Sequence, residues 1–416
     1  MIAAETEGAP AVATASRRRG RRWLAGLLAL ASAAVVFLRA PAAPCRDFCT
    51  YYSAGLLVRE GRAAAAYDRR ELAAAHRAAH ASPFGVGPWL YSPVWLPPAA
   101  ALAALPFERA EAVHRLLGAA ALGFGLLFVL ARIASPALQL AVAGAFALSH
   151  PAWVALVMQN WSWLLFAAVA AAWWAGERGR DGWAGLGWAA AVHLKAFVVL
   201  APVALLVTGR RGVALRAAAL AALVAALALP ATGVAPWQRY LGFLDDAKTA
   251  GVTPYYNKVS LQATAARFAS EPRDWVAPRG KVATPVVRGL FWLGLPLYAL
   301  GLARLRRSPA AALAFALAFV LLFVPQIWDH TELLLFAALP ALPRRHLLAL
   351  TALLAASAAY NALQQPLLHE VLRGEKPPLA LQSLLLWFPA VNLLALGAAL
   401  AAGRESAGAP ADARAA

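Results

Sequence analysis

The sequence has few of the charged residues that a soluble enzyme carries on its surface. Only 14% of its 416 residues are charged and 62% are hydrophobic, and the mean hydropathy is +0.61, well outside the range of soluble domains. Apolar runs of about 15 to 25 residues, long enough to cross a bilayer core as a helix, recur from Trp23 to Ala402. The shortage of charge therefore excludes a soluble domain and predicts an all-α polytopic membrane protein.

Cysteine is also scarce. The chain has two cysteines, Cys45 and Cys49, and a single pair cannot brace so long a chain. Their C-x-x-x-C spacing is not a usual zinc or redox signature. The two can pair if they lie outside the cytoplasm, and the sequence leaves this open.

The signature motifs of several enzyme classes are absent. The chain has no H-E-x-x-H, no P-loop and no G-x-G-x-x-G between a strand and a helix. These absences argue against metalloproteases, ATP-driven pumps and nucleotide-sugar enzymes. We therefore assign no metal ligand and no cofactor, and the sequence leaves a metal requirement open.

The net charge of +18 does not indicate nucleic-acid binding, because the arginines stand in short clusters between apolar runs. Such clusters mark cytoplasmic loops. They predict a multi-pass protein of a bacterial-type plasma (inner) membrane with both termini in the cytoplasm. The clusters are Arg17 to Arg22, Arg132, 177–181, 209–211, 304–307, 344–345 and Arg404.

The pattern of apolar runs predicts one membrane domain, residues 17–402, between disordered tails at 1–16 and 403–416. The first apolar helix, at 23–38, follows a basic flank and precedes "AAP", as in a signal peptide. We favour an uncleaved helix because the rest of the chain is membrane too. Longer polar loops, at about 39–90 and 231–284, should then lie on the outer face.

Two apolar segments do not fit simple spans. The segment 183–207 is too short for two full crossings, so we expect a pair of broken half-helices that meet near Lys195. The segment 91–106 contains Pro93, Pro97 and Pro98 and is a candidate re-entrant segment. Whether both parts of 91–131 cross stays open.

Polar residues that are unusual in such a chain gather near the expected outer face. Asp47 can serve as a general base, or it can be merely a helix cap or a solvated loop acid. Tyr51 and Tyr52 can stack on a sugar ring or only anchor the chain at the interface. No internal repeat is evident.

Each of several basic and acidic residues elsewhere in the chain can likewise have either a functional or a purely structural role. Lys195 is one of five lysines and the only one inside an apolar run, so it either snorkels or binds a phosphate. Arg267 is a loop arginine that could grip the same phosphate. Asp329 and His330 precede an apolar helix, where Asp329 can act only as an N-cap and His330 can hydrogen-bond a phosphate or a substrate hydroxyl.

Several stretches, taken in order over about residues 47–340, resemble the membrane-embedded GT-C glycosyltransferases, and most closely glycosyltransferase family 87, the polyprenol-phosphate-mannose-dependent α-mannosyltransferases. These stretches are "RDFCTYYSAGLLVREGRAAAAYD", "YSPVWLPPAAALAALPF", "VMQNWSWLL", "GLGWAAAVHLKAFVVLAP", "NKVSLQATAARF" and "PQIWDHTELLL". Met158 departs from the family's Gly-Gln-x-Asn pattern, where a glycine is expected. Cys45 and Cys49 are not part of the family pattern either.

The resemblance implies a GT-C-like fold with about 11–13 transmembrane or re-entrant helices and an outer-face active site. It implies transfer of a hexose, with mannose expected, from a polyprenyl-phosphate donor to a glycolipid or glycan, with inversion and with Asp47 as the general base. Lys195, Arg267 and His330 would bind the donor phosphate. The candidates for binding substrate are Tyr51, Tyr52, Gln159, Asn160, Asn257 and Asp329. The expected partners are membrane lipid, donor and acceptor, and no nucleic acid.

Three other interpretations stay open. A membrane transporter or lipid flippase has similar broken helices and buried charges. A lipid-linked oligosaccharide ligase or polymerase uses the same lipid-phosphate chemistry, and a GT-C-like protein without catalysis could serve as a partner in an envelope complex. The acceptor, its linkage, the identity of the sugar and the oligomeric state are not readable from the sequence.

Overall fold

The computed structural model describes residues 9–41, 47–79, 86–249, 252–275, 278–325, 327–373 and 384–408. Helices make up nearly all of this part of the chain. It contains no strand, only two isolated bridges, Val252 with Val282 and Lys258 with Trp328. The predicted all-α polytopic membrane fold is confirmed.

The helices follow one another with short connections. The α-helices are α1 (Ala9–Arg39), α2 (Asp47–Arg59), α3 (Arg69–Ala79), α4 (Leu96–Leu102), α5 (Phe107–Leu130), α6 (Pro136–Leu148), α7 (His150–Val157), α8 (Ser162–Glu177), α9 (Asp181–Leu194), α10 (Leu200–Val207), α11 (Arg211–Thr232), α12 (Ala235–Thr249), α13 (Leu261–Phe268), α14 (Pro285–Leu305), α15 (Pro309–Phe323), α16 (Leu333–Ala338), α17 (Arg344–Leu372) and α19 (Trp387–Gly408). Short 3-10 turns include η1 (Ala63–Tyr67), η2 (Pro93–Trp95), η3 (Ala196–Val199), η4 (Pro272–Trp275), η5 (Asp329–Glu332), η6 (Leu339–Ala341) and η7 (Leu384–Leu386).

Five helices of the described chain are long and apolar enough to cross a membrane: α1 from Arg19 onward, α5, α11, α14 and α19. The pair α6 and α7 makes a sixth candidate, bent by 44°. The bend falls at Ser149, whose backbone is extended and whose hydroxyl caps α7 by accepting from the Ala152 N–H. The chain is therefore a multi-pass membrane protein.

The outermost helices extend further than expected. α1 begins at Ala9, inside the segment 1–16 predicted to be a disordered tail, and α19 continues to Gly408, beyond the predicted boundary at 402. The extension of α1 is rich in alanine, which has the highest intrinsic helix propensity. Both extensions continue a long apolar helix that is already formed. Residues 1–8 and 409–416 lie outside the described residues.

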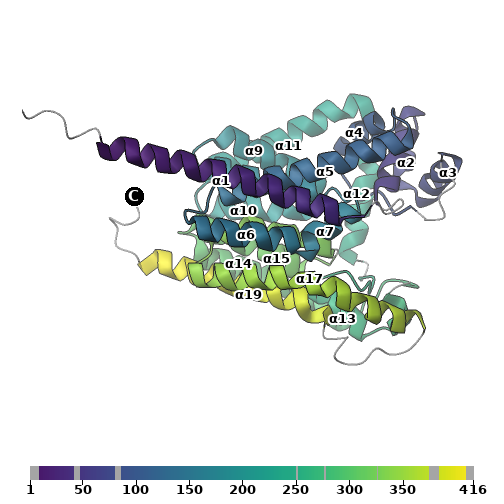
Figure 1. Cartoon of the computed structure of the whole chain (residues 1–416). Coiled ribbons are helices and arrows are strands. Elements are labelled where there is room, and N and C mark those ends of the chain that lie inside the picture. The colour runs from purple at the N-terminus through teal and green to yellow at the C-terminus, as the bar shows by residue number, and fades with distance from the viewer. Residues whose placement is uncertain are drawn as a thin grey trace, which may run out of the picture.

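The two ends of the bundle differ in character. At one end lie the N-terminal end of α1 and the C-terminal end of α19, and at the other lie the short helices α2, α3, α12 and α13 (Figure 1). At the end with the N-terminus of α1, arginines of the predicted clusters form ion pairs between different helices. Arg132 makes a bidentate ion pair with Glu177, with both distances 2.8 Å, and Arg345 pairs with Glu405.

The two irregular segments behave as the sequence predicts. Lys195 has an extended backbone (φ −145°, ψ 106°) and separates α9 from η3 and α10, so 183–207 is a broken pair. α4 has 7 residues, about 10 Å of helix at 1.5 Å per residue, which is too short to cross a bilayer. The segment 91–106 therefore does not span, and α5 is the candidate span of this region.

Close packing fixes α2 at its end of the bundle. A Cβ atom on Gly55 would collide with the carbonyl group of Ala99 in α4, so this contact requires glycine. Phe48 and Leu57, on the same helix, are fully buried. α2 therefore lies firmly against the bundle, and its first residue, Asp47, starts from a fixed position.

Candidate active site

Asp47 is the first residue of α2 and is half-buried. Its backbone N–H donates to the carbonyl oxygen of Met158 at 3.1 Å. The side-chain Nδ2 of Asn160 donates to its Oδ2 at 2.5 Å. The turn that follows α7 therefore holds both the backbone and the carboxylate of Asp47.

Gln159 gives this turn its shape. It is the one non-glycine residue with positive φ (54°) in the described chain, and its Nε2 donates to Oε1 of Glu111 on α5 at 2.6 Å. A left-handed backbone is unfavourable for a residue with a Cβ and often marks a functional site. Met158 is right-handed (φ −74°), so its position does not need the glycine of the family pattern.

An aromatic wall stands beside the carboxylate. The hydroxyls of Tyr51 and Tyr91 are 2.8 Å apart, and the Tyr51 ring stacks on Trp161 with centroids 4.4 Å apart. Both tyrosines lie close enough to Asp47 to interact with it electrostatically. Tyr51, predicted to bind substrate, is therefore close to Asp47, while Tyr91 and Trp161 were not among the predicted site residues.

Lys195 approaches from the break between α9 and η3. Its Nζ lies 4.7 Å from the centroid of the Tyr91 ring, and it interacts electrostatically with Asp47 and with His330. No hydrogen-bond partner holds this Nζ within the described chain. Ser92 ties the Tyr91 segment to α9 through a 3.0 Å contact between its Oγ and Nδ1 of His193.

His330 completes the group from the far end of the sequence. Its side chain is 4% exposed, and neither ring nitrogen has a hydrogen-bond partner in the described part of the chain. Its ring is parallel to that of Trp328, at 9° and 6.4 Å between centroids. A buried polar group without a partner is costly unless a ligand satisfies it, so this imidazole is free to bind one.

Asp329 has both carboxylate oxygens engaged. Oδ2 lies 2.8 Å from Nε2 of His150, and Oδ1 accepts from the backbone N–H of His330 at 2.8 Å. The side chains of Asp329 and His150 are 2% and 1% exposed. Both oxygens of Asp329 are therefore engaged by groups of the protein. His150 was missed because a histidine within an apolar run gives no signal that distinguishes it from a core residue.

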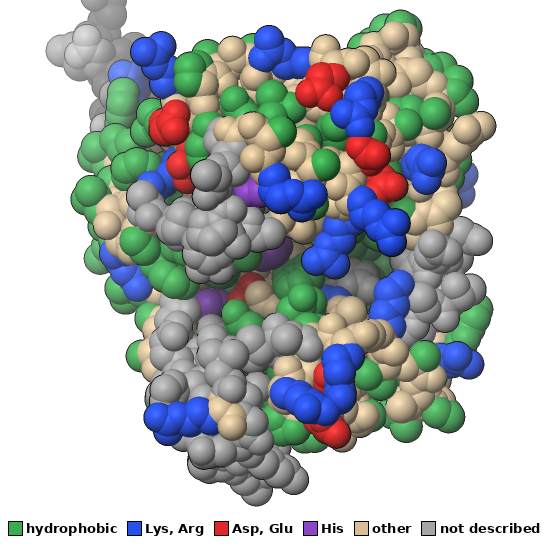
Figure 2. Space-filling model, turned by 90° about the vertical axis from the view of Figure 1, so that its right-hand side faces the viewer, with side chains coloured by type: hydrophobic (Ala, Val, Ile, Leu, Met, Phe, Trp, Pro, Cys, Tyr) green, Lys and Arg blue, Asp and Glu red, His purple; other side chains and the backbone are tan. Residues whose placement is uncertain are grey.

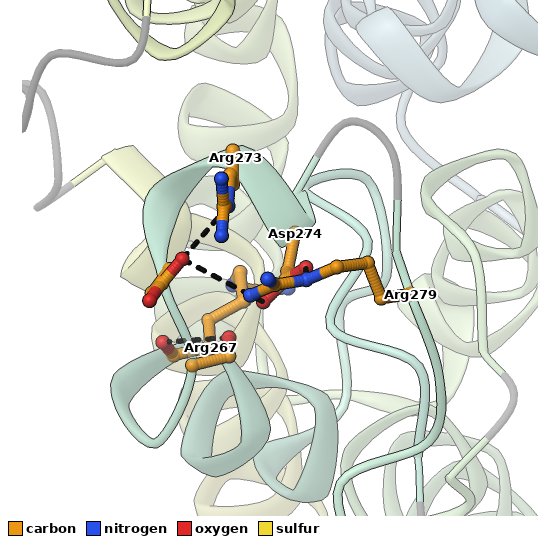
Figure 3. A network of polar contacts seen from close by, with 6 residues as sticks. Arg267, Arg273, Asp274 and Arg279 are labelled. Carbon is orange, nitrogen blue, oxygen red and sulfur yellow. Dashed lines mark hydrogen bonds and ion pairs between the residues drawn. The ribbon is translucent and has the colours of Figure 1, made fainter.

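Arg267, on α13, is buried and uses its guanidinium to hold the loop before it. Nη1 donates to the carbonyl oxygens of Tyr255 (2.9 Å) and Lys258 (2.6 Å), and Nη2 donates to Oγ1 of Thr264 (2.9 Å). Figure 3 shows it beneath an ion-pair network in which Arg279 bonds Asp274. Its Nη donors therefore have partners, whereas Nε has none among the described residues, and the predicted contact with a phosphate stays a prediction.

The remaining predicted residues divide between the site and its surroundings. Tyr52 donates to the carbonyl oxygen of Leu105 at 2.8 Å and packs on Phe107, so it braces α2. Asn257 is 9% exposed, and its Oδ1 has no partner among the described residues. Its carbonyl oxygen accepts from the Asp329 N–H at 3.0 Å, which places Asn257 next to His330.

The end of the bundle that carries α2 is hollowed at its centre (Figure 2). Lys and Arg side chains surround the hollow, and histidine and acidic side chains are visible inside it. Such a concave surface with convergent polar groups is the usual form of a binding site. A separate cavity of about 180 Å³, between α8, α9, α10, α11 and α15, contains none of the predicted site residues.

Cys49 is buried and disulfide-bonded. The other cysteine of the chain, Cys45, lies outside the described residues. Cys49 belongs to the first turn and a half of α2, close to Asp47.

A membrane bundle with a polar site at one end defines a membrane-embedded enzyme or carrier, and comparison with known families decides between the two. The family model of Glycosyltransferase family 87 matches residues 89–325, more than half of the chain. The chain therefore belongs to glycosyltransferase family 87 and is a membrane glycosyltransferase. No curated protein and no solved structure matches it. The matched residues include Lys195, while Asp47 precedes the matched segment and His330 follows shortly after it.

Proposed function

We propose that this protein transfers a hexosyl residue, mannose in the first instance, from a polyprenyl-phosphate donor to a glycolipid or glycan acceptor, with inversion at the anomeric carbon. One observation carries the proposal. Lys195 interacts electrostatically with both Asp47 and His330, and these three residues come from distant parts of the sequence. Membership of a glycosyltransferase family supports the reaction class.

Asp47 is the proposed general base. Its carboxylate takes the proton from the acceptor hydroxyl, whose oxygen bonds the anomeric carbon while the bond from that carbon to the phosphate oxygen breaks. The phosphate leaves as an anion and needs no proton, so one carboxylate is enough. The bond from Asn160 supports this role because it fixes the orientation of the carboxylate.

Lys195 and His330 are the proposed ligands of the donor phosphate. An ammonium group and a ring N–H can both stabilise the charge that grows on the leaving oxygen, and they act most strongly where water is excluded. Among the described residues, no hydrogen-bond partner occupies the Lys195 Nζ or the ring nitrogens of His330. Arg267 would contribute by shaping the loop around them, since its Nη atoms already bond carbonyl oxygens.

The other residues would shape the pocket. Asn257 has an amide oxygen without a partner among the described residues, and such a group can bind a sugar hydroxyl. Tyr51, buried and stacked on Trp161, would belong to the wall of the pocket. Asn160 and Gln159 would position Asp47, and Asp329 would position His330. Tyr52 would support α2.

The proposed orientation places the arginine-rich end, with both termini, in the cytoplasm and the hollowed end outside. Positive residues in short loops favour the cytoplasmic side. A bacterial-type plasma membrane would present the lipid-linked donor at its outer leaflet, next to α2 and α13.

The test is a donor panel with purified, detergent-solubilised protein. Short-chain polyprenyl phosphates carrying mannose, glucose or galactose are each incubated with an extract of envelope glycolipids and glycans, and the products are identified by mass spectrometry. We expect transfer from the mannosyl donor, with an inverted linkage. Movement of intact donor across proteoliposomes without transfer would instead establish a flippase, and transfer of a whole preassembled glycan would establish a ligase.

A further inference from the structure

The short helix α7 contacts both halves of the proposed site. It has 8 residues, from His150 to Val157, which is about 12 Å of helix at 1.5 Å per residue. Its C-terminal turn bonds Asp47 through the Met158 carbonyl and the Asn160 amide. At its N-terminal end, His150 bonds Asp329.

His150 is itself held from several sides. Its backbone N–H donates to Oγ of Ser357 on α17 at 3.0 Å. Its ring packs edge-to-face on Tyr360, with centroids 5.0 Å apart, and lies near Phe388. The imidazole can therefore offer Asp329 one fixed Nε2–H.

The Asp329 carboxylate, which His150 orients, in turn contacts His330. Its Oδ1 accepts the backbone N–H of His330 and lies 3.7 Å from the ring Nδ1. This carboxylate makes no hydrogen bond to the imidazole ring among the described residues. It positions His330 through the bond to the backbone N–H, at the start of η5, from which the side chain projects.

We propose that His150 is a positioning residue that orients His330 through Asp329, and that α7 thereby sets the separation between His330 and the carboxylate of Asp47. This inference rests on the proposed function for the roles of Asp47 and His330. The geometry of the chain from His150 to His330 stands without it. A misplacement of a reacting group by about 1 Å can cost about a hundredfold in rate.

The alternative is that His150 only fills and satisfies the core. Both roles would lower stability when the residue is removed, so stability alone cannot distinguish them. Two other readouts distinguish the roles: the ¹⁵N resonances of the His330 ring, and whether the loss of activity falls on kcat or on KM.

The experiment compares His150→Gln with His150→Phe in the full-length protein. The Nε2 of glutamine can take the place of the imidazole Nε2–H and bond Asp329, whereas phenylalanine keeps the ring volume and loses the donor. His76→Phe, at a buried histidine of α3, is the matched control. Imidazole ¹⁵N resonances of the donor-free protein, assigned with His330→Gln, report the His330 ring, and transfer assays give kcat and the KM for the donor.

We expect His150→Phe to shift the His330 resonances and to lower kcat about tenfold to a hundredfold with KM nearly unchanged. His150→Gln should restore most of both, and His76→Phe should leave them unaltered. Unchanged His330 resonances in folded His150→Phe, or equal losses in both His150 variants, would overturn the proposal. Because the resonances need no donor, a wild-type protein inactive in transfer would count against the proposed function and leave this test intact.

Discussion

Asn160 donates a 2.5 Å hydrogen bond to Oδ2 of Asp47 across 113 positions of the sequence. Oδ1 of the same asparagine accepts from the N–H and the hydroxyl of Ser162, at 2.9 and 2.8 Å. The amide therefore cannot rotate without losing three bonds. The consequence is a carboxylate held in one orientation at the start of its helix.

The strained turn before Asn160 can be tested by substitution. Gln159→Ala and Gln159→Gly both remove the bond to Glu111, but only alanine keeps a Cβ at a φ of 54°. We expect the glycine variant to be the more stable of the two by about 1 kcal/mol. Thermal unfolding in detergent measures the difference, and an alanine variant of equal or greater stability would show that the turn relaxes to another conformation.

Removal of the Lys195 charge should weaken binding of the polyprenyl-phosphate donor. Lys195→Met removes the charge and preserves much of the length, and a hydrogen bond to a charged group contributes about 1.5–3 kcal/mol. The dissociation constant of a short-chain polyprenyl phosphate should therefore rise roughly tenfold to a hundredfold. Lys281→Met, which removes an exposed lysine, is the control. Equal affinities of the two variants would mean that Lys195 only snorkels.

Substitution of Arg267 should lower the free energy of unfolding. Arg267→Met would leave the carbonyl oxygen of buried Lys258 without its partner and remove one of the two donors to the Tyr255 carbonyl oxygen, at a cost of about 2 kcal/mol or more. Arg273→Met removes an exposed ion pair with Glu271 and should cost about 1 kcal/mol or less. If Arg267→Met folds as stably as the wild type yet no longer binds the donor, the phosphate contact predicted from the sequence is correct after all.

Lys258 should make stability depend on pH. Burial, aided by Lys281 and Arg267, lowers its pKa from 10.5 to about 7, while the unfolded chain keeps the ordinary value. Between these values the unfolded state binds more protons than the folded state, so the free energy of unfolding rises with pH from about 7 to about 10.

Thermal unfolding of the wild type and Lys258→Met across this range checks the sign. The rise should be smaller in the variant, because methionine carries no proton to lose, and the variant should be the more stable of the two near pH 7. Parallel curves for the two proteins would show that Lys258 keeps its ordinary pKa.

Some of the site was predictable because polar groups are conspicuous in an apolar chain. Asp47, Lys195 and His330 stand out for that reason, and the short length of 183–207 located the break at Lys195. The partners that hold them were not predictable. His150, Tyr91 and Trp161 lie in apolar or aromatic stretches, where a core residue and a site residue give the same pattern.

The loop before α13 was the hardest part to predict. Its irregular backbone has no periodicity, so the sequence shows Arg267 as an exposed loop arginine, whereas its guanidinium is buried beneath the loop. The helical extension of α1 to Ala9 was missed for the opposite reason. An alanine-rich segment without apolar periodicity is weakly helical alone and becomes helical when a long helix continues through it.

The most direct measurement is sugar transfer by Asp47→Asn beside the wild type, with a short-chain polyprenyl-phosphate mannose donor and candidate acceptors. Asparagine keeps the shape of the side chain and removes its basicity. We predict transfer by the wild type, a loss of about a hundredfold or more in kcat for the folded variant, and unchanged donor binding. Equal activity of the two proteins would contradict the account, because Asp47 would then be only the first residue of a helix.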